Sequence, residues 1–320
     1  MSVAQVWVVA EPTSGDITTT SKELISEARR RGAAVSAITW GAGGEALADV
    51  VGAYGASRLW DLGDLGAVLP ASAVAATMKR LLEDETPDAI LIPASNDGRD
   101  IAGRLSVMLD ASVLTNVTGL REGATLESEH PIFGGTLTVV ARLLSSAPGL
   151  FVVRAKSFVA TPDGPGPAQR HSVTPVAVST RVATIRSSHV EERTGPALED
   201  ARVVVSGGRG LGDAASYELV EELARLLQGA PGASRAIVDA GWVPYSHQVG
   251  QTGKTVKPDL YIACGISGAT QHMVGMKGAA HIVAINKDPD APIFAISDLG
   301  VVGDVQRVLP ALIAQLKSRS

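Results

Sequence analysis

The chain has 320 residues, enough for about two domains of the usual size. A net charge of −5 and an aromatic content of 4% argue against a protein that binds nucleic acid through its phosphates or by base stacking. The single cysteine, Cys264, excludes a disulfide framework and a cysteine-ligated zinc site, and the histidines have no metal-ligand spacing, so we expect no metal. The apolar runs are too short to cross a membrane, and the amino-terminal run lacks the basic start of a signal peptide. We therefore expect a cytoplasmic protein that is not an integral membrane protein.

Aliphatic strands alternate with helices over the first 110 residues. The pattern predicts strands over residues 3–10, 33–40 and 88–93, and helices over residues 19–31, 68–83 and 98–109. Nearly continuous aliphatic strands between helices indicate a parallel sheet covered on both faces. From about residue 113 to 185 no full helix separates the strand-like segments, such as residues 137–141 and 151–155. We expect these segments to be antiparallel additions to the sheet.

A polar stretch over residues 187–200 predicts a linker between two domains. We place an amino-terminal α/β domain at residues 1–190, the linker at 191–200 and a carboxyl-terminal domain at 201–320. In the last of these the pattern predicts strands over residues 202–206, 236–239, 260–264 and 282–285, and helices over 214–227, from 271 and over 305–316. The predicted fold class is α/β with two domains, the second built on a doubly wound parallel sheet.

Two glycine-rich loops of the second domain each follow a predicted strand and precede a helix. Their sequences are Ser206-Gly207-Gly208-Arg209-Gly210-Leu211-Gly212 and Gly265-Ile266-Ser267-Gly268-Ala269-Thr270-Gln271-His272. Backbone N–H groups in such loops bind anions, and the guanidinium of Arg209 is suited to a phosphate. The first loop is not the nicotinamide dinucleotide fingerprint, because Asp213 stands where the third glycine belongs. A plain tight turn is the other interpretation of that loop.

A third stretch, Gly250-Gln251-Thr252-Gly253-Lys254-Thr255, superficially resembles a phosphate-binding P-loop. Gln248 stands where that pattern requires a glycine, and Pro258 follows where a helix would continue. We therefore reject nucleotide triphosphate hydrolysis. Two anion-binding loops in one small domain indicate a dinucleotide held by a fold other than the usual nicotinamide-binding one.

The same segments resemble the α subunit of electron transfer flavoprotein. The resemblance rests on residues 206–212, 232–235, 248–254, 261–272 and 283–289, which occur in that family's order and spacing. In the first domain it rests on Asn96-Asp97-Gly98-Arg99-Asp100 and Pro131-Ile132-Phe133-Gly134-Gly135. Thr270 is a departure, since many members carry an aliphatic residue there. We expect it to affect helix packing more than flavin binding.

The resemblance implies that the carboxyl-terminal domain binds FAD. It places the following residues at the cofactor: Arg209, Ser234, Arg235, Val249, Gly250, Gln251, Thr252, Ser267, Gly268, Ala269, Thr270, Gln271, His272, Asn286 and Asp304. The loop that begins at Ser267 is expected to give amides to the pyrophosphate, and Asn286 and Asp304 to contact the adenosine half. Thr252 is expected to donate its hydroxyl near N5 of the flavin ring. Arg235 and His272 are expected to place positive or proton-donating groups where the reduced ring becomes negative.

The resemblance also implies an electron carrier with no catalytic residues of its own. Such a carrier takes electrons from flavin dehydrogenases, such as the acyl-CoA dehydrogenases of fatty acid β-oxidation, and passes them to a membrane-associated quinone oxidoreductase. It works as a heterodimer with a β subunit that binds AMP, contributes to the flavin site and contacts the amino-terminal domain. Two alternatives remain. A nicotinamide-dependent dehydrogenase is disfavoured by the failed fingerprint and the lack of an acid–base pair, and a nucleotide-binding sensor without redox chemistry is supported only by the same loops.

Overall fold

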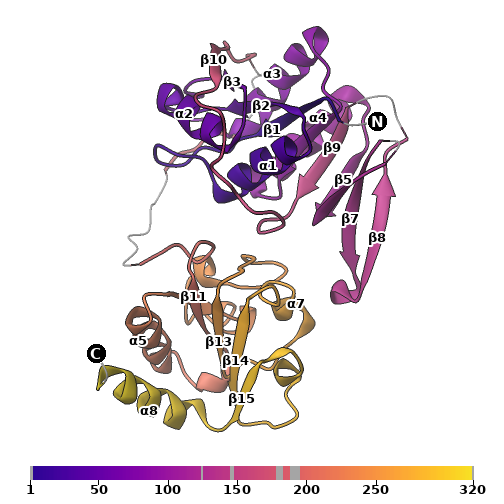
Figure 1. Cartoon of the computed structure of the whole chain (residues 1–320). Coiled ribbons are helices and arrows are strands. Elements are labelled where there is room, and N and C mark those ends of the chain that lie inside the picture. Colours follow the sequence, from indigo (N-terminus) through magenta and orange to yellow (C-terminus); the bar gives the residue numbers. More distant parts are fainter. Residues whose placement is uncertain (1–2, 124, 145–147, 178–182, 188–194, 319–320) are drawn as a thin grey trace. The chain divides into compact units, whose positions relative to one another are not determined.

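The computed structural model describes residues 3–123, 125–144, 148–177, 183–187 and 195–318. The chain divides into two compact units, Met1–His189 and Val190–Ser320 (Figure 1). Of the predicted linker, residues 191–194 lie outside the described residues. Among the described helices, none combines the length and the apolar composition that a membrane span requires.

A seven-stranded sheet forms the centre of the first unit, in the order β10-β3-β2-β1-β4-β9-β5. Its strands are β1 (Gln5–Val9), β2 (Ala34–Thr39), β3 (Arg58–Asp61), β4 (Ala89–Pro93), β5 (Val113–Val117), β9 (Gly149–Val153) and β10 (Gln169–Ser172), and the helices are α1 (Thr19–Arg30), α2 (Gly44–Tyr54), α3 (Pro70–Asp84) and α4 (Asn96–Leu109). All neighbouring strands pair in parallel. The predicted parallel sheet is confirmed, although the sequence pattern did not reveal α2 or β3.

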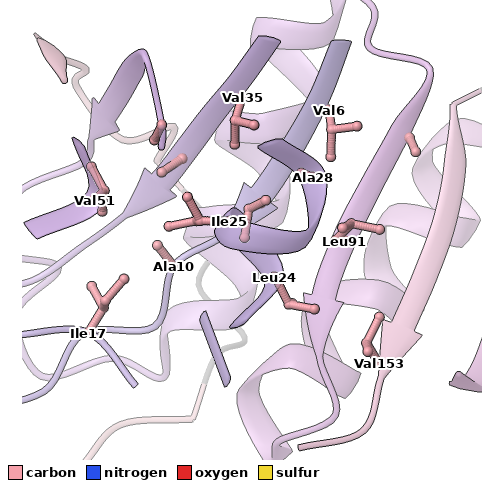
Figure 2. Close-up of a cluster of buried hydrophobic side chains, with 14 of the residues drawn as sticks. Val6, Ala10, Ile17, Leu24, Ile25, Ala28, Val35, Val51, Leu91 and Val153 are labelled. Atoms are coloured by element: carbon pink, nitrogen blue, oxygen red, sulfur yellow. The ribbon is translucent and has the colours of Figure 1, made fainter. Parts of the chain in front are cut away.

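The sheet of the first unit is buried on both faces. On one face Leu24 and Ile25 of α1 pack with Val6 of β1 and Leu91 of β4 (Figure 2). Side chains alternate along a strand, so Trp7 turns to the opposite face and packs there with residues of α3 and α4. Each fully buried aliphatic side chain contributes roughly 1.5–3 kcal/mol. This two-sided burial explains why the strands read as continuous aliphatic runs.

The strands after residue 113 only partly match the prediction. β6 (Gly119–Glu122), β7 (Leu126–Ile132) and β8 (Leu137–Arg142) are antiparallel, as expected, but they form a separate three-stranded sheet. The segment that begins the predicted strand over residues 151–155 belongs to β9, which pairs in parallel with β4 and β5. All five residues of β9 are buried, as an interior parallel strand requires. The small antiparallel sheet lies between β5 and β9 in the chain, which explains the missing helical signal.

The second unit is built on five parallel strands in the order β12-β11-β13-β14-β15. The strands are β11 (Val203–Gly207), β12 (Ala230–Ala233), β13 (Leu260–Cys264), β14 (His281–Asn286) and β15 (Leu299–Val302), and the helices are α5 (Glu218–Leu226), α6 (Arg235–Val238), α7 (Thr270–Met273) and α8 (Val305–Lys317). Helices α5 and α8 cover one face, where Leu223 and Leu309 pack with Val205 and Ile262. The predicted doubly wound parallel sheet is confirmed.

The strand predicted over residues 236–239 is wrong, because most of this segment is helix α6. The strand lies earlier, at β12, whose sequence is Ala-Pro-Gly-Ala. Proline and glycine are rare in strands, and this composition hid β12 from the sequence pattern. Pro231 is tolerated because β12 is at the edge of the sheet, where a missing N–H costs no ladder hydrogen bond.

Glu11 is a buried carboxyl group just beyond β1. Its side chain bonds to the hydroxyl of Ser95, the residue that caps α4. Loss of solvent raises the pKa of Glu11 to about 7, although the Ser95 hydrogen bond acts in the opposite direction. The folded state therefore holds the proton more tightly than the unfolded chain does. Stability should fall as the pH rises from about 4.5 towards 7, since the unfolded chain loses its proton first.

Glu11→Gln should remove this pH dependence, because glutamine resembles the protonated carboxyl. We expect the variant to be more stable than the wild type at pH 8 by about 1–3 kcal/mol, with little difference at pH 4.5. Urea unfolding at the two pH values measures this, with Glu45→Gln on the exposed surface of α2 as the control. The same stability difference at both pH values would contradict the assignment.

Candidate FAD-binding site

The predicted site residues gather at one edge of the second sheet. Arg209 follows β11, Ser234 and Arg235 follow β12, Ser267 lies in the loop after β13, Asn286 ends β14 and Asp304 follows β15. All five strands are parallel, so their carboxyl ends share one edge. In open α/β sheets ligands bind at this edge, where the strand order reverses. Here the reversal lies between β11 and β13, the two strands that carry the glycine-rich loops.

These two loops are in direct backbone contact. Gly208 N–H donates to the Cys264 carbonyl at 2.9 Å, and Gly210 N–H donates to the Gly265 carbonyl at 2.9 Å. A Cβ atom on Gly210 would lie 2.7 Å from the Gly265 Cα, and a Cβ atom on Gly208 would collide with the Gly265 carbonyl oxygen. Gly265 itself has φ +65°, which a larger residue rarely adopts. The glycines therefore allow the loops to pack together without side chains between them.

The loop after β13 presents donors for an anion. Within the described parts of the chain, no acceptor pairs with the backbone N–H of Ser267, Gly268 or Ala269. Ser267 and Ala269 are exposed, while Gly268 has φ +88° and packs against the Ile293 backbone. Consecutive free N–H groups form a concave site for phosphate oxygens. Arg209 is also exposed, and its guanidinium makes no ion pair with any described residue.

Asn286 and Asp304 hold neighbouring loops in place. The Asn286 amide donates to the Ile266 carbonyl at 2.9 Å, and its oxygen accepts from the Asp288 N–H at 3.0 Å. The Asp304 carboxylate caps α8 by accepting from the Gln306 N–H at 3.0 Å. Each side chain therefore has a structural hydrogen bond besides any contact that it makes to a ligand.

Residues 249–252 belong to the same edge, although they follow no strand. Val249 N–H donates to the Ala233 carbonyl at the end of β12, at 2.9 Å. Gln251 N–H donates to the Gln271 carbonyl at 2.7 Å, which joins this segment to α7. Thr252 is exposed, and its carbonyl accepts a hydrogen bond from the Tyr245 hydroxyl. The structure thus brings Thr252 to the same edge as the glycine-rich loops.

His272 of α7 is buried, whereas Thr270 and Gln271, which precede it, are exposed. Its Nε2 atom lies 2.9 Å from the Tyr261 hydroxyl. Burial lowers the pKa of His272 to about 4, although the backbone of Val249 acts in the opposite direction. The ring is therefore neutral at neutral pH. Of the two groups predicted to be positive or proton-donating, only Arg235 is a permanent cation.

Arg235 is exposed at the start of α6. Its Nε atom lies 3.1 Å from the Asp239 carboxylate, one helical turn later. Both side chains are more than half exposed, so water screens the pair and the guanidinium remains available.

The sequence did not reveal two contacts of the candidate site. One is the ion pair between Arg235 and Asp239. The other is the hydrogen bond that the buried Gln248 amide donates to the Thr252 hydroxyl at 3.0 Å. Neither contact has a spacing motif that would have identified it.

A hollow in the first unit has a different lining. It measures about 400 Å³ and lies by the carboxyl ends of β1 and β4, lined by Glu11, Pro12, Thr18, Trp40, Ser95, Asn96 and Asp97. Burial and the nearby Asp100 raise the pKa of Asp97. The lining contains the carboxyl groups of Glu11 and Asp97 and no arginine, lysine or histidine. These lining residues therefore offer a phosphate group no positive charge to pair with. The free amides of Ser267, Gly268 and Ala269 and the exposed guanidinium of Arg209 lie in the second unit.

Taken together, the parallel sheet, the paired glycine loops and the free amides define a dinucleotide-binding protein. The family model described as electron transfer flavoprotein FAD-binding domain matches residues 197–277, and the electron transfer flavoprotein domain matches residues 6–180. The electron transfer flavoprotein α subunit of Mycobacterium leprae is 41% identical, over 99% of each chain. That of Mycobacterium tuberculosis (strain CDC 1551 / Oshkosh) is 42% identical, over 99% of each chain. Protein FixB of Clostridium saccharobutylicum is 36% identical, over 98% of this chain and 96% of its own.

The chain belongs to the α subunits of the electron transfer flavoprotein family. Its cofactor is FAD, and its general role is electron transfer. The residues present fit this cofactor, because the donors at the carboxyl edge suit a pyrophosphate. Thr252 and Arg235 are exposed, so their hydroxyl and guanidinium groups are available to a ligand at this edge.

Proposed function

We propose that this chain, paired with a β subunit, carries electrons from flavin dehydrogenases such as acyl-CoA dehydrogenases to a membrane-associated quinone oxidoreductase. The observation that supports this most is the exposure of Thr252 and Arg235, the two residues proposed to contact the flavin ring. A ring held at an open edge is accessible to other redox proteins. The proposal places the protein in the cytoplasm and in fatty acid β-oxidation, as a carrier without its own substrate.

The proposed FAD contacts divide by chemistry. The N–H groups of Ser267, Gly268 and Ala269 bind the pyrophosphate, together with Arg209. Asn286 and Asp304 contact the adenosine half. Thr252 and Arg235 face the ring, and the remaining contacts are Ser234, Val249, Gly250, Gln251, Thr270, Gln271 and His272. FAD supplies the electron-accepting chemistry, and the protein supplies position and charge.

Anaerobic reduction of the purified heterodimer tests the proposed donor. An acyl-CoA dehydrogenase with its acyl-CoA substrate should bleach the visible flavin absorbance, while acyl-CoA alone should not. Reduction by chemical reductant but by no flavin dehydrogenase would contradict the proposed donor. Rapid direct reduction by NADH would support the nicotinamide-dependent dehydrogenase instead.

The hairpin of β7 and β8 is the surface that we propose for the β subunit (Figure 1). Leu137, Val139 and Val140 of β8 are all exposed, and Phe133 in the connection between the strands is 75% exposed. Leu137 and Val139 face one side of β8 and Val140 faces the other, because side chains alternate along a strand. Apolar residues exposed on both faces of a hairpin are typical of a surface that a partner covers.

Leu137→Asp should therefore weaken assembly of the heterodimer by at least tenfold, because it places a charge in the proposed apolar contact. Val107→Asp introduces the same charge at an exposed apolar position of α4 and serves as the control. Titration of each variant with the β subunit, followed by sedimentation velocity, gives the two dissociation constants. Equal weakening by both variants would argue against the hairpin as the contact.

Arg235→Ala should lower the reduction potential of the bound flavin. The guanidinium favours the added negative charge, and solvent reduces the effect to a shift on the order of 50–120 mV. Arg235→Lys should lose less, because it keeps the charge. Arg202→Ala is the matched control, since Arg202 has an exposed aspartate partner but precedes β11, at the opposite end of the sheet. Spectroelectrochemical titration gives each potential, and a wild-type potential in Arg235→Ala would contradict the assignment.

A further inference from the structure

The buried side chain of Gln248 contacts Thr252, a residue that we propose to contact the flavin. Gln248 is only 3% exposed, whereas Thr252 is exposed. The main chain of Gln248 is already fixed, because its N–H donates to the Tyr245 carbonyl at 2.9 Å and its carbonyl accepts from the Lys254 N–H at 2.7 Å. Backbone contacts therefore close this turn. The side-chain amide is not needed for that purpose.

The amide of Gln248 instead determines the direction of one hydroxyl group. Its Nε2 atom donates to Thr252 Oγ1 at 3.0 Å. A hydroxyl has one hydrogen to donate and two lone pairs to accept with, and the amide N–H occupies one lone pair. The hydroxyl hydrogen cannot point at this N–H donor. Among the described residues no acceptor pairs with it, so it is free to point outward from the edge of the sheet.

We propose that Gln248 is a positioning residue that holds the Thr252 hydroxyl as a hydrogen-bond donor toward the flavin ring. The inference rests on the proposed placement of Thr252 at the ring. A donor aimed at a ring atom that gains negative charge stabilises the reduced cofactor and raises its potential. A donor whose direction is fixed before reduction needs no reorientation during it. Gln248 thus acts on the flavin through Thr252 and without touching it.

A double-mutant cycle on the FAD-loaded heterodimer tests this proposal. Thr252→Val keeps the shape and removes the hydroxyl, and Gln248→Met keeps the length and removes the donor. We expect Thr252→Val to lower the flavin potential, and Gln248→Met to lower it by about a third to two thirds as much. In the Thr252→Val background, Gln248→Met should cause no further shift, because there is no hydroxyl left to orient. Gln315→Met on the exposed surface of α8 is the matched control.

Two further variants separate orientation from a general loosening of the loop. Thr252→Ser retains the hydroxyl, so its potential should stay near that of the wild type when Gln248 is present. Adding Gln248→Met to Thr252→Ser should lower the potential. Gln248→Glu keeps the shape but accepts a hydrogen bond, which turns the Thr252 hydrogen inward. It should lower the potential more in the wild-type background than in the Thr252→Val background. If melting temperature and FAD content show that Gln248→Met does not fold, the comparison of Gln248→Glu in the two backgrounds tests the proposal instead.

The outcomes that overturn the proposal are distinct. If Gln248→Met shifts the potential equally with and without the Thr252 hydroxyl, the amide acts on its own. If it shifts nothing while Thr252→Val lowers the potential, the hydroxyl needs no positioning residue. If Thr252→Val itself leaves the potential unchanged, Thr252 does not reach the ring and the role of Gln248 fails with it. In each of these cases the electron-carrier proposal still depends on the separate reduction by a flavin dehydrogenase.

Discussion

The backbone contact between the loops after β11 and β13 is the constraint on which the second unit depends. The loops meet at the reversal of strand order, and Gly208, Gly210 and Gly265 leave no side chain between them. Any Cβ atom on Gly208 would force the loops apart. Because the loops pack this closely, the loop that carries Arg209 and the loop that carries the free N–H groups of residues 267–269 meet at one edge. The anion site is therefore a consequence of glycine packing.

The two units have similar parallel sheets, but different residues lie at the carboxyl ends of their strands. Both have a reversal of strand order, between β1 and β4 in the first and between β11 and β13 in the second. At the first reversal the protein places Glu11 and Asp97 in a lining that contains no arginine, lysine or histidine. At the second it leaves amides free and exposes Arg209. In the proposed site, the chemistry of the loops, and not the topology of the sheet, decides which edge accepts FAD.

Much of the fold could be predicted from the sequence, because aliphatic runs and glycine loops carry strong local signals. The individual site residues came from the family resemblance and stay a prediction. The errors occur where tertiary context overrides local propensity. β12 contains Pro231 and Gly232 and is a strand only because it pairs at the edge of the sheet with β11. The neutral state of His272 depends on its burial, which no local pattern reports. The contact between Gln248 and Thr252 likewise requires a folded turn.

Amide hydrogen exchange with and without FAD tests the account most directly. If the edge at β11 and β13 holds the cofactor, FAD should slow exchange at the backbone N–H groups of Ser267, Gly268 and Ala269, which have no described acceptor in the protein. Exchange at Asn96 and Asp97, beside the acidic hollow of the first unit, should be unchanged. The account would be contradicted if FAD protected Asn96 and Asp97 while the amides of Ser267, Gly268 and Ala269 exchanged as before.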